Sequence, residues 1–298
     1  MGSDQHYPEE APCHWAEVEG FWMDRAPVTN AQFLKFVKAT GHITVAERPA
    51  DPADYPGAPP EQLRPASIVF VPPSHPVPLS QHHAWWRYLN GADWRHPEGP
   101  GSSIRHRDRH PVVHVACADA EAYALWAGKD LPSEREWERA ARGGLENAEY
   151  AWGDVFQPGG RLLANTWQGT FPHHNSRADG FERTSPVGSF PANGYGLVDM
   201  IGNVWEWTSS WYSGSHAASV AAATVASAGC CAAAEAARLA SIDPTSEHGA
   251  LPRRVVKGGS HLCAPSYCRR YRPAARMAQG IDTSTSHMGF RCIIRVAP

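Results

Sequence analysis

The sequence has little charge and no long apolar run. Only 19% of its 298 residues are charged and the net charge is −3, so it lacks the basic character that nucleic acids and anionic membranes attract. A transmembrane helix needs about 20 mostly apolar residues, and the best candidate, residues 217–240, is interrupted by Glu235 and Arg238. The N-terminus lacks the basic and apolar segments of a signal peptide. We therefore expect no nucleic-acid or membrane partner, and a cytoplasmic location.

Cysteine is sparse and odd in number. The seven cysteines do not form the dense, even pattern of a secreted disulfide scaffold, which favours mostly reduced thiols. Twelve tryptophans with 26 glycines and 26 prolines are typical of an irregular fold fastened by large aromatic anchors. Because no internal repeat or linker is visible, we predict one loop-rich α+β domain over residues 1–298.

Three helices are predicted from capping signals and apolar spacing. Thr29 and Gln32 form a capping box, and Gly41 ends that helix. A second helix is expected over residues 119–127, and a third from the Ser133 capping box to Gly143. Residues 213–250 are rich in Ala and Ser without clear apolar periodicity, which predicts an inserted surface loop. The adjacent Cys230 and Cys231 in that loop have no flanking ligands, so we expect them to be inert.

Cys263 and Cys268 form a C-x4-C pair whose spacing allows several chemistries. A structural zinc site needs four ligands, and no second cysteine pair completes one. Two thiolates suit a soft, low-coordinate ion such as Cu(I), and the neighbouring Arg269, Arg270 and Arg272 are expected to keep the thiolates ionised. Inert buried thiols and one structural disulfide are the alternatives. The spacing alone does not decide between them.

The text around this pair resembles the signature of the formylglycine-generating enzyme family, GGS-x-x-C-x-x-S-Y-C-x-R-Y-R-x-AAR followed by GFRC. Further resemblance covers WRHPEGPGSSI, NTWQGTFP and NGYGLVDMIGNVWEWTSSW, and so most of the chain. It implies the loop-rich α+β fold of the C-type-lectin-like superfamily. GN-x-WEW and GFR are shared with non-catalytic relatives and with iron-dependent sulfoxide synthases. The cysteine pair is specific to the enzyme.

The resemblance implies an oxidase that uses O2 and a thiol reductant. Cu(I) would lie between Cys263 and Cys268, and the cysteine of an unfolded sulfatase segment, Cys-x-Pro-x-Arg, would become formylglycine. Ser260 and Trp205 would form part of the active-site wall; their ordinary alternatives are a turn serine and a core tryptophan. A group of aromatic and basic side chains would line the peptide cleft, unless these tryptophans are core residues: Trp85, Trp86, Trp94 and Arg95.

The resemblance also implies two structural calcium sites with oxygen ligands. The first would use the side chains of Asn165 and Asp179 with the carbonyls of Thr166 and Phe181. The second would use the side chains of Asp199 and Glu206 with the carbonyls of Gly202 and Val204. The alternatives are turn residues that cap their own backbone and, for Glu206, a buried carboxylate paired with an arginine.

Two departures and two rival functions follow from the same comparison. The disulfide positions of secreted relatives are Ala124, Ala141 and Pro273 here, which leaves Cys292 without a partner and favours a reduced form. Relatives have an earlier glycine-rich strand that ends in MGS, so the start is expected to be truncated and a sheet edge exposed. One rival is a non-catalytic binding module. A sulfoxide synthase, the other, would need an additional helical domain.

Overall fold

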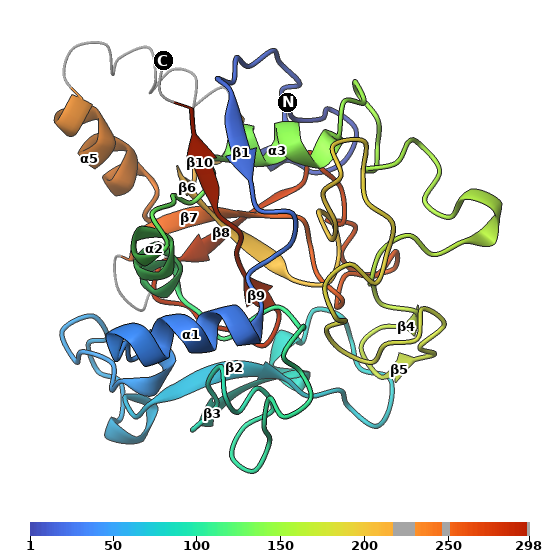
Figure 1. The fold of residues 1–298 in the computed structure, drawn as a ribbon. Helices are drawn as coiled ribbons and strands as arrows, with labels where there is room; N and C mark the ends of the chain where they lie inside the picture. Colours follow the sequence, from blue (N-terminus) through green and yellow to red (C-terminus); the bar gives the residue numbers. More distant parts are fainter. Residues whose placement is uncertain (217–229, 246–250, 297–298) are drawn as a thin grey trace.

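Four small sheets and four α-helices form the described part of the chain, residues 1–216, 230–245 and 251–296 of a computed structural model (Figure 1). The helices are α1 (Asn30–Thr40), α2 (Cys117–Trp126), α3 (Glu134–Arg142) and α5 (Cys230–Ala240). The strands are β1 (Phe21–Met23), β2 (Ala66–Phe70), β3 (Trp86–Asn90), β4 (Gly169–Thr170), β5 (His174–Asn175), β6 (Trp205–Trp211), β7 (Arg253–Lys257), β8 (Arg276–Gly280), β9 (Met288–Gly289) and β10 (Ile293–Arg295). Long loops connect them, as expected for a loop-rich α+β fold.

The largest sheet has the strand order β8-β7-β6-β9. β6 is antiparallel to β7 and parallel to β9, and β7 is antiparallel to β8. Aromatic and β-branched residues favour strands, and here Trp205 and Trp207 in β6 and Val255 and Val256 in β7 are buried. The sheet therefore supplies one wall of the core and carries the chain directly into the cysteine segment that follows β7.

Capping signals placed the predicted helices correctly. In α1 the Thr29 side chain accepts from the backbone of Gln32, and Gly41 has the left-handed φ of 70° that ends the helix. In α3 the Ser133 side chain accepts from the backbone of Glu136. The helix predicted over residues 119–127 is confirmed as α2, two residues earlier at its start. Local sequence was sufficient at these helix ends.

The core packs α1 and α2 together through aromatic rings. The rings of Phe36 and Tyr123 meet edge to face with their centroids 5.5 Å apart, and Phe33 contacts Trp94 at 5.2 Å. Phe290, after β9, completes this group at 5.3 Å from Tyr123. No helix in the described residues is long and apolar enough to cross a membrane.

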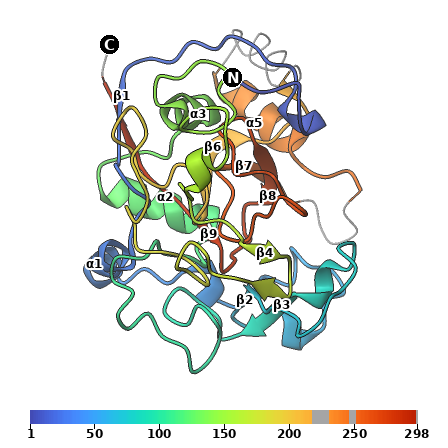
Figure 2. The ribbon, with the colours of Figure 1, turned by 90° about the vertical axis from the view of Figure 1, so that its right-hand side faces the viewer.

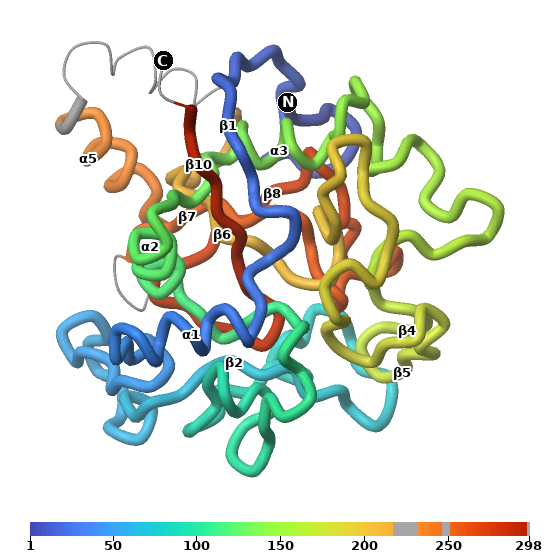
Figure 3. Tube along the Cα trace, in the orientation of Figure 1, coloured from blue at the N-terminus to red at the C-terminus, as the bar shows by residue number. Residues whose placement is uncertain are grey.

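A strand near the start of the chain pairs with the last strand of the described residues. β1 and β10 run side by side as an antiparallel pair with Trp22 opposite Ile294 (Figures 1 and 3). Before β1, residues 2–11 form what we call the N-terminal strap, which is held against the body of the protein. The backbone N–H of Gly2 donates to the buried carboxylate of Glu138 at 2.8 Å.

The predicted loop over residues 213–250 contains a helix, so that prediction was wrong for residues 230–240. Alanine has the highest helix propensity, and the segment forms α5 without strong apolar periodicity. Arg238 and Glu235 form an ion pair of 2.8 Å on its surface. The side chains of Cys230 and Cys231 lie outside the described part, so their inertness stays a prediction.

Candidate functional site

A tight turn after β7 folds the cysteine segment back on itself. Gly258 and Gly259 have φ values of 92° and 69°, a region that favours glycine. A Cβ on Gly259 would lie 2.8 Å from the carbonyl oxygen of Arg270. This close approach brings residues 260–270 into one compact loop, with the two cysteines on the same side of it.

The sulfur atoms of Cys263 and Cys268 lie 3.2 Å apart, and no disulfide joins them. Cys263 is buried and Cys268 is half-buried. Burial raises the pKa of the Cys263 thiol, while the hydrogen bond from Cys263 lowers the pKa of Cys268. The pair therefore favours one thiol that donates to one thiolate.

Ser260 adjoins this pair, as the resemblance implied. It is buried, and its backbone N–H donates to the sulfur of Cys263 at 3.4 Å. Its hydroxyl oxygen accepts from the backbone of Leu262, which is the turn role considered as the alternative. Trp205 lies buried in β6, in the same apolar core group as Cys263. The active-site roles of both residues stay predictions.

Only one of the three neighbouring arginines bears on the thiolate in the predicted way. The positive charge of Arg270 helps to lower the pKa of Cys268. Arg272 instead forms two hydrogen bonds to Glu10, and Arg269 contacts Glu149 at 3.3 Å. All three guanidinium groups are paired with carboxylates, and only Arg270 also lowers the pKa of Cys268, so the expectation that all three would hold the thiolates ionised is corrected.

The N-terminal strap supplies contacts that sequence reasoning missed. The Tyr7 hydroxyl accepts from the backbone N–H of Arg269, the residue after Cys268, at 3.1 Å. Glu9 pairs with Arg270 at 2.6 Å. Since these partners are separated by more than 250 residues, no local pattern could have indicated them.

An aromatic cluster packs against the cysteine loop and includes two of its apolar residues. Its buried members are Phe70, Trp85, Trp167, Phe171, Leu262 and Ala264. Tyr267, next to Cys268, stacks on Phe171 with a centroid distance of 4.3 Å. Figure 2 shows the β4–β5 pair beside β2. The ring of Phe171, between β4 and β5, stacks on the ring of Phe70 in β2 with a centroid distance of 5.8 Å. The cluster thus connects three distant segments next to the cysteines.

The predicted group of cleft-lining residues separates into two places. Trp85 belongs to the aromatic cluster but is fully buried, and Trp86 packs half-buried on His287 at 4.9 Å. Trp94 is fully buried in the main core with the Arg95 guanidinium 4.2 Å from its ring. Trp85 and Trp94 therefore take the core alternative given for the tryptophans, and the prediction that they line a cleft is corrected. Arg95 is partly exposed and pairs with Glu47.

The first calcium set has a feature that suits a cation. One carboxylate oxygen of Asp179 accepts from the backbone of Phe181 at 3.0 Å, and the other is buried without a hydrogen-bond partner among the described residues. Burial raises the pKa of this carboxyl group. The Asn165 amide donates to the carbonyl of Arg183 at 2.9 Å, and Thr166 follows it. Oxygen donors of this kind fit calcium.

In the second calcium set, the carboxylate of Glu206 already has hydrogen-bond partners within the protein. Arg291 donates two hydrogen bonds of 2.7 Å to Glu206, and the Trp137 indole donates another of 2.7 Å. This is the arginine-paired alternative considered for Glu206. Asp199 accepts from Gly188, and burial raises its pKa to about 6. The calcium role of Asp199, Gly202, Val204 and Glu206 stays a prediction.

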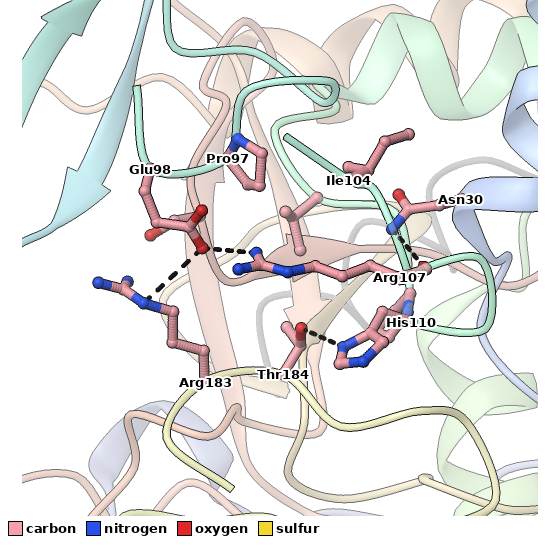
Figure 4. A pocket seen from close by; sticks show the side chains of 11 residues that line it. Asn30, Pro97, Glu98, Ile104, Arg107, His110, Arg183 and Thr184 are labelled. Carbon is pink, nitrogen blue, oxygen red and sulfur yellow. Dashed lines mark hydrogen bonds and ion pairs between the residues drawn. The ribbon is translucent and has the colours of Figure 1, made fainter. Parts of the chain in front are cut away.

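In a small cavity, the charged side chains of the lining pair with one another. Its volume is about 20 Å³, enough for one water molecule. Glu98 lies between Arg107 at 2.6 Å and Arg183 at 3.7 Å, and His110 contacts Thr184 at 3.0 Å (Figure 4). This cavity lacks the cysteines and offers no free charge, so we assign it no chemistry.

Taken together, these features define a loop-rich α+β protein in which two free cysteines of one loop lie with their sulfur atoms in contact. Residues 1–296 match the model of the sulfatase-modifying factor enzyme 1-like domain. The chain is 55% identical to the formylglycine-generating enzyme of Mycobacterium tuberculosis, over 98% of this chain and 93% of that protein. It is 46% identical to the formylglycine-generating enzyme of Mus musculus, over 98% of this chain and 71% of that one.

Among solved structures, PvdO from Pseudomonas aeruginosa superimposes with a TM-score of 0.58 at 23% identity, covering 99% of this chain and 90% of that one. That likeness supports the fold alone. The family match and the two relatives place the chain in the sulfatase-modifying factor family, as an enzyme of the formylglycine-generating class. The non-catalytic alternative would not require the paired cysteines.

Proposed function

We propose that this enzyme converts the cysteine of a Cys-x-Pro-x-Arg segment in an unfolded sulfatase into Cα-formylglycine. The observation that carries the proposal is the Cys263–Cys268 pair, with its sulfur atoms 3.2 Å apart in a loop that retains the full family signature. The names of the relatives at 55% and 46% identity support the same reaction.

In the proposed reaction, O2 takes electrons from two sources. The substrate Cβ loses two electrons as its CH2–SH group becomes an aldehyde, and a pair of external thiols loses two more. Formylglycine, hydrogen sulfide, water and a disulfide are the products, so the atoms and electrons balance. Neither of the enzyme's own cysteines is consumed in this balance.

Cu(I) is the proposed resident metal. Two soft sulfur donors suit it, and the sulfur atoms of Cys263 and Cys268 lie 3.2 Å apart. When bound by Cys263 and Cys268, copper would supply the one-electron chemistry that O2 needs. The thiolate favoured at Cys268 is the form that a metal binds. Ser260 would hold Cys263 through its backbone N–H.

Calcium at Asn165, Thr166, Asp179 and Phe181 is proposed as a structural ion, and the second set as a weaker case of the same kind. The unpartnered Asp179 oxygen supports the first site.

A cytoplasmic, reducing location is also proposed. The free thiols Cys117, Cys263, Cys268 and Cys292 support it, because reducing compartments keep such thiols unpaired.

The test is mass spectrometry of a Cys-x-Pro-x-Arg peptide incubated with copper-loaded enzyme, O2 and a thiol. We expect the mass loss that accompanies change of CH2–SH to an aldehyde, together with capture of the product by an aldehyde-reactive hydrazine. A peptide with serine in place of cysteine is the matched control and should not change. Absence of conversion by enzyme that binds copper would contradict the proposal.

A further inference from the structure

A cavity of about 270 Å³ adjoins the aromatic cluster. Its lining includes Phe70, Trp167, His173, His174, Arg177 and Glu182. Phe70 and Trp167 are members of the aromatic cluster, and the histidines lie at the β4–β5 turn. The cavity is therefore built jointly by β2 and by the segment from Trp167 to Arg183.

Trp167 links this cavity directly to the cysteine pair. Its backbone N–H donates to the carbonyl of Cys263 at 3.0 Å. Its ring packs edge to face on Phe171 at 5.2 Å, and Phe171 in turn stacks on Tyr267. Trp167 therefore has its backbone bonded to the cysteine loop and its side chain in the wall of the cavity.

Two lining residues carry buried nitrogen atoms that have no partner among the described residues. One is the indole N–H of Trp167, a side chain that is 4% exposed, and the other is Nδ1 of His173. A buried donor without an acceptor costs about 1–3 kcal/mol, and such groups in native proteins call for an explanation. Both nitrogens belong to the wall of one cavity, which indicates an acceptor from outside the chain.

The charges around the cavity select the same kind of ligand. Its single carboxylate, Glu182, is already paired with Arg177 at 3.0 Å. Arg183 is turned toward Glu98 and also donates to the carbonyl of Phe70 at 3.3 Å (Figure 4). Asn175 is bonded to the backbone of Arg177 and Glu182, which leaves the indole N–H, two histidines and the guanidinium of Arg177. These groups suit a carbonyl or carboxylate and disfavour an ammonium or guanidinium group.

We propose that this cavity is a subsite for the client polypeptide, which takes a residue flanking the target cysteine that carries a hydrogen-bond acceptor, Asp or Asn, with Trp167 as the donor. The inference rests on the proposed function, since it assumes a polypeptide substrate at the cysteine pair. It assigns Trp167 a binding role as well as a packing role.

The test measures peptide binding without turnover. A fluorescent client peptide with serine in place of the target cysteine is prepared with Asp, Asn or Lys at each flanking position in turn, and its Kd is measured by anisotropy. At one position, Asp and Asn should bind more tightly than Lys. Trp167→Phe keeps a ring against Phe171 but removes the N–H, and should weaken binding of the Asp and Asn peptides by about two- to tenfold.

Two further variants separate this role from a packing role. Trp152→Phe also removes an indole N–H, but one that already donates to its own loop at Val155 O, so peptide binding should be unchanged. Arg177→Gln should reduce the preference for Asp over Asn and leave the Asn peptide unaffected. Equal binding of Asp, Asn and Lys peptides at every position would overturn the inference, as would unchanged binding by folded Trp167→Phe. This experiment measures binding and not conversion. Its outcome is therefore independent of whether the enzyme carries out the proposed oxidation.

Discussion

The guanidinium of Arg272 donates hydrogen bonds of 2.8 and 2.5 Å to the carboxylate of Glu10, and both side chains are almost completely buried. This ion pair fastens the N-terminal strap to the segment that follows Cys268. Breaking a buried pair leaves one charge uncompensated. The strap is therefore expected to matter for stability and for the shape of the cysteine loop.

Replacing Glu10 with Ala should lower the free energy of unfolding by about 3–5 kcal/mol, because Arg272 would remain buried without a counter-charge. Urea denaturation followed by fluorescence measures this loss. Glu9→Ala is the matched control: its pair with Arg270 is partly exposed to solvent, so a loss of about 1 kcal/mol or less is expected. Equal losses in the two variants would contradict this account of the strap.

Replacing either Cys263 or Cys268 with Ser should abolish Cu(I) binding and peptide conversion and leave the fold intact. The reason is that a two-sulfur site loses half of its soft donors. Copper content by elemental analysis and conversion by mass spectrometry are the measurements. Cys117→Ser changes a buried free thiol outside the cysteine loop and should retain both activities. Full conversion by the Cys263 or Cys268 variant would refute the assignment.

Removal of calcium with a chelator should lower the melting temperature. An ion that binds only the folded state stabilises it by about 2.7 kcal/mol when its concentration is 100 times its Kd. Asp179→Asn should lower the melting temperature in calcium and make it insensitive to the chelator, because Asp179 provides the unpartnered oxygen of the first set. A wild-type melting temperature that does not respond to the chelator would count against structural calcium.

Stability should fall as the pH drops from about 6.5 to 5. Burial lowers the pKa of His114 and of His261 to about 4 and that of His287 to about 3. The unfolded chain binds protons on these groups below its ordinary histidine pKa of about 6.5, whereas the folded chain does not. The stabilising contribution of these neutral histidines is therefore complete above about pH 6.5. At pH 5, each of the three has lowered the free energy of unfolding by about 2 kcal/mol.

Urea denaturation at a series of pH values checks this slope. His287→Gln removes one of the three buried histidines and should make the free energy of unfolding depend less steeply on pH. The same change at the exposed His75 should leave the pH dependence unchanged. A free energy of unfolding that is constant between pH 7 and pH 5 in the wild type would show that the buried histidines do not govern the acid limit.

Signals that act within one turn of chain were readable from the sequence. The capping boxes at Thr29 and Ser133 and the glycines after the helices fixed α1 and α3, because each depends on bonds between residues three or four apart. The Ala-rich segment was misjudged because periodicity was weighed above propensity, and α5 forms there. Trp94 was assigned to a cleft although a large aromatic residue gives no local sign of which surface it meets.

The sequence by itself determined which chemistry is available: two cysteines in a signature loop, a glycine pair that bends it, and the oxygen donors around Asn165 and Asp179. Only the tertiary structure decided which groups act together. It paired Arg272 with Glu10 and Glu206 with Arg291. It also bonded the backbone N–H of Trp167 to Cys263 and left the indole N–H of that residue without a partner among the described residues. The physical reason is that burial and pairing depend on distance in space, and these partners are far apart along the chain.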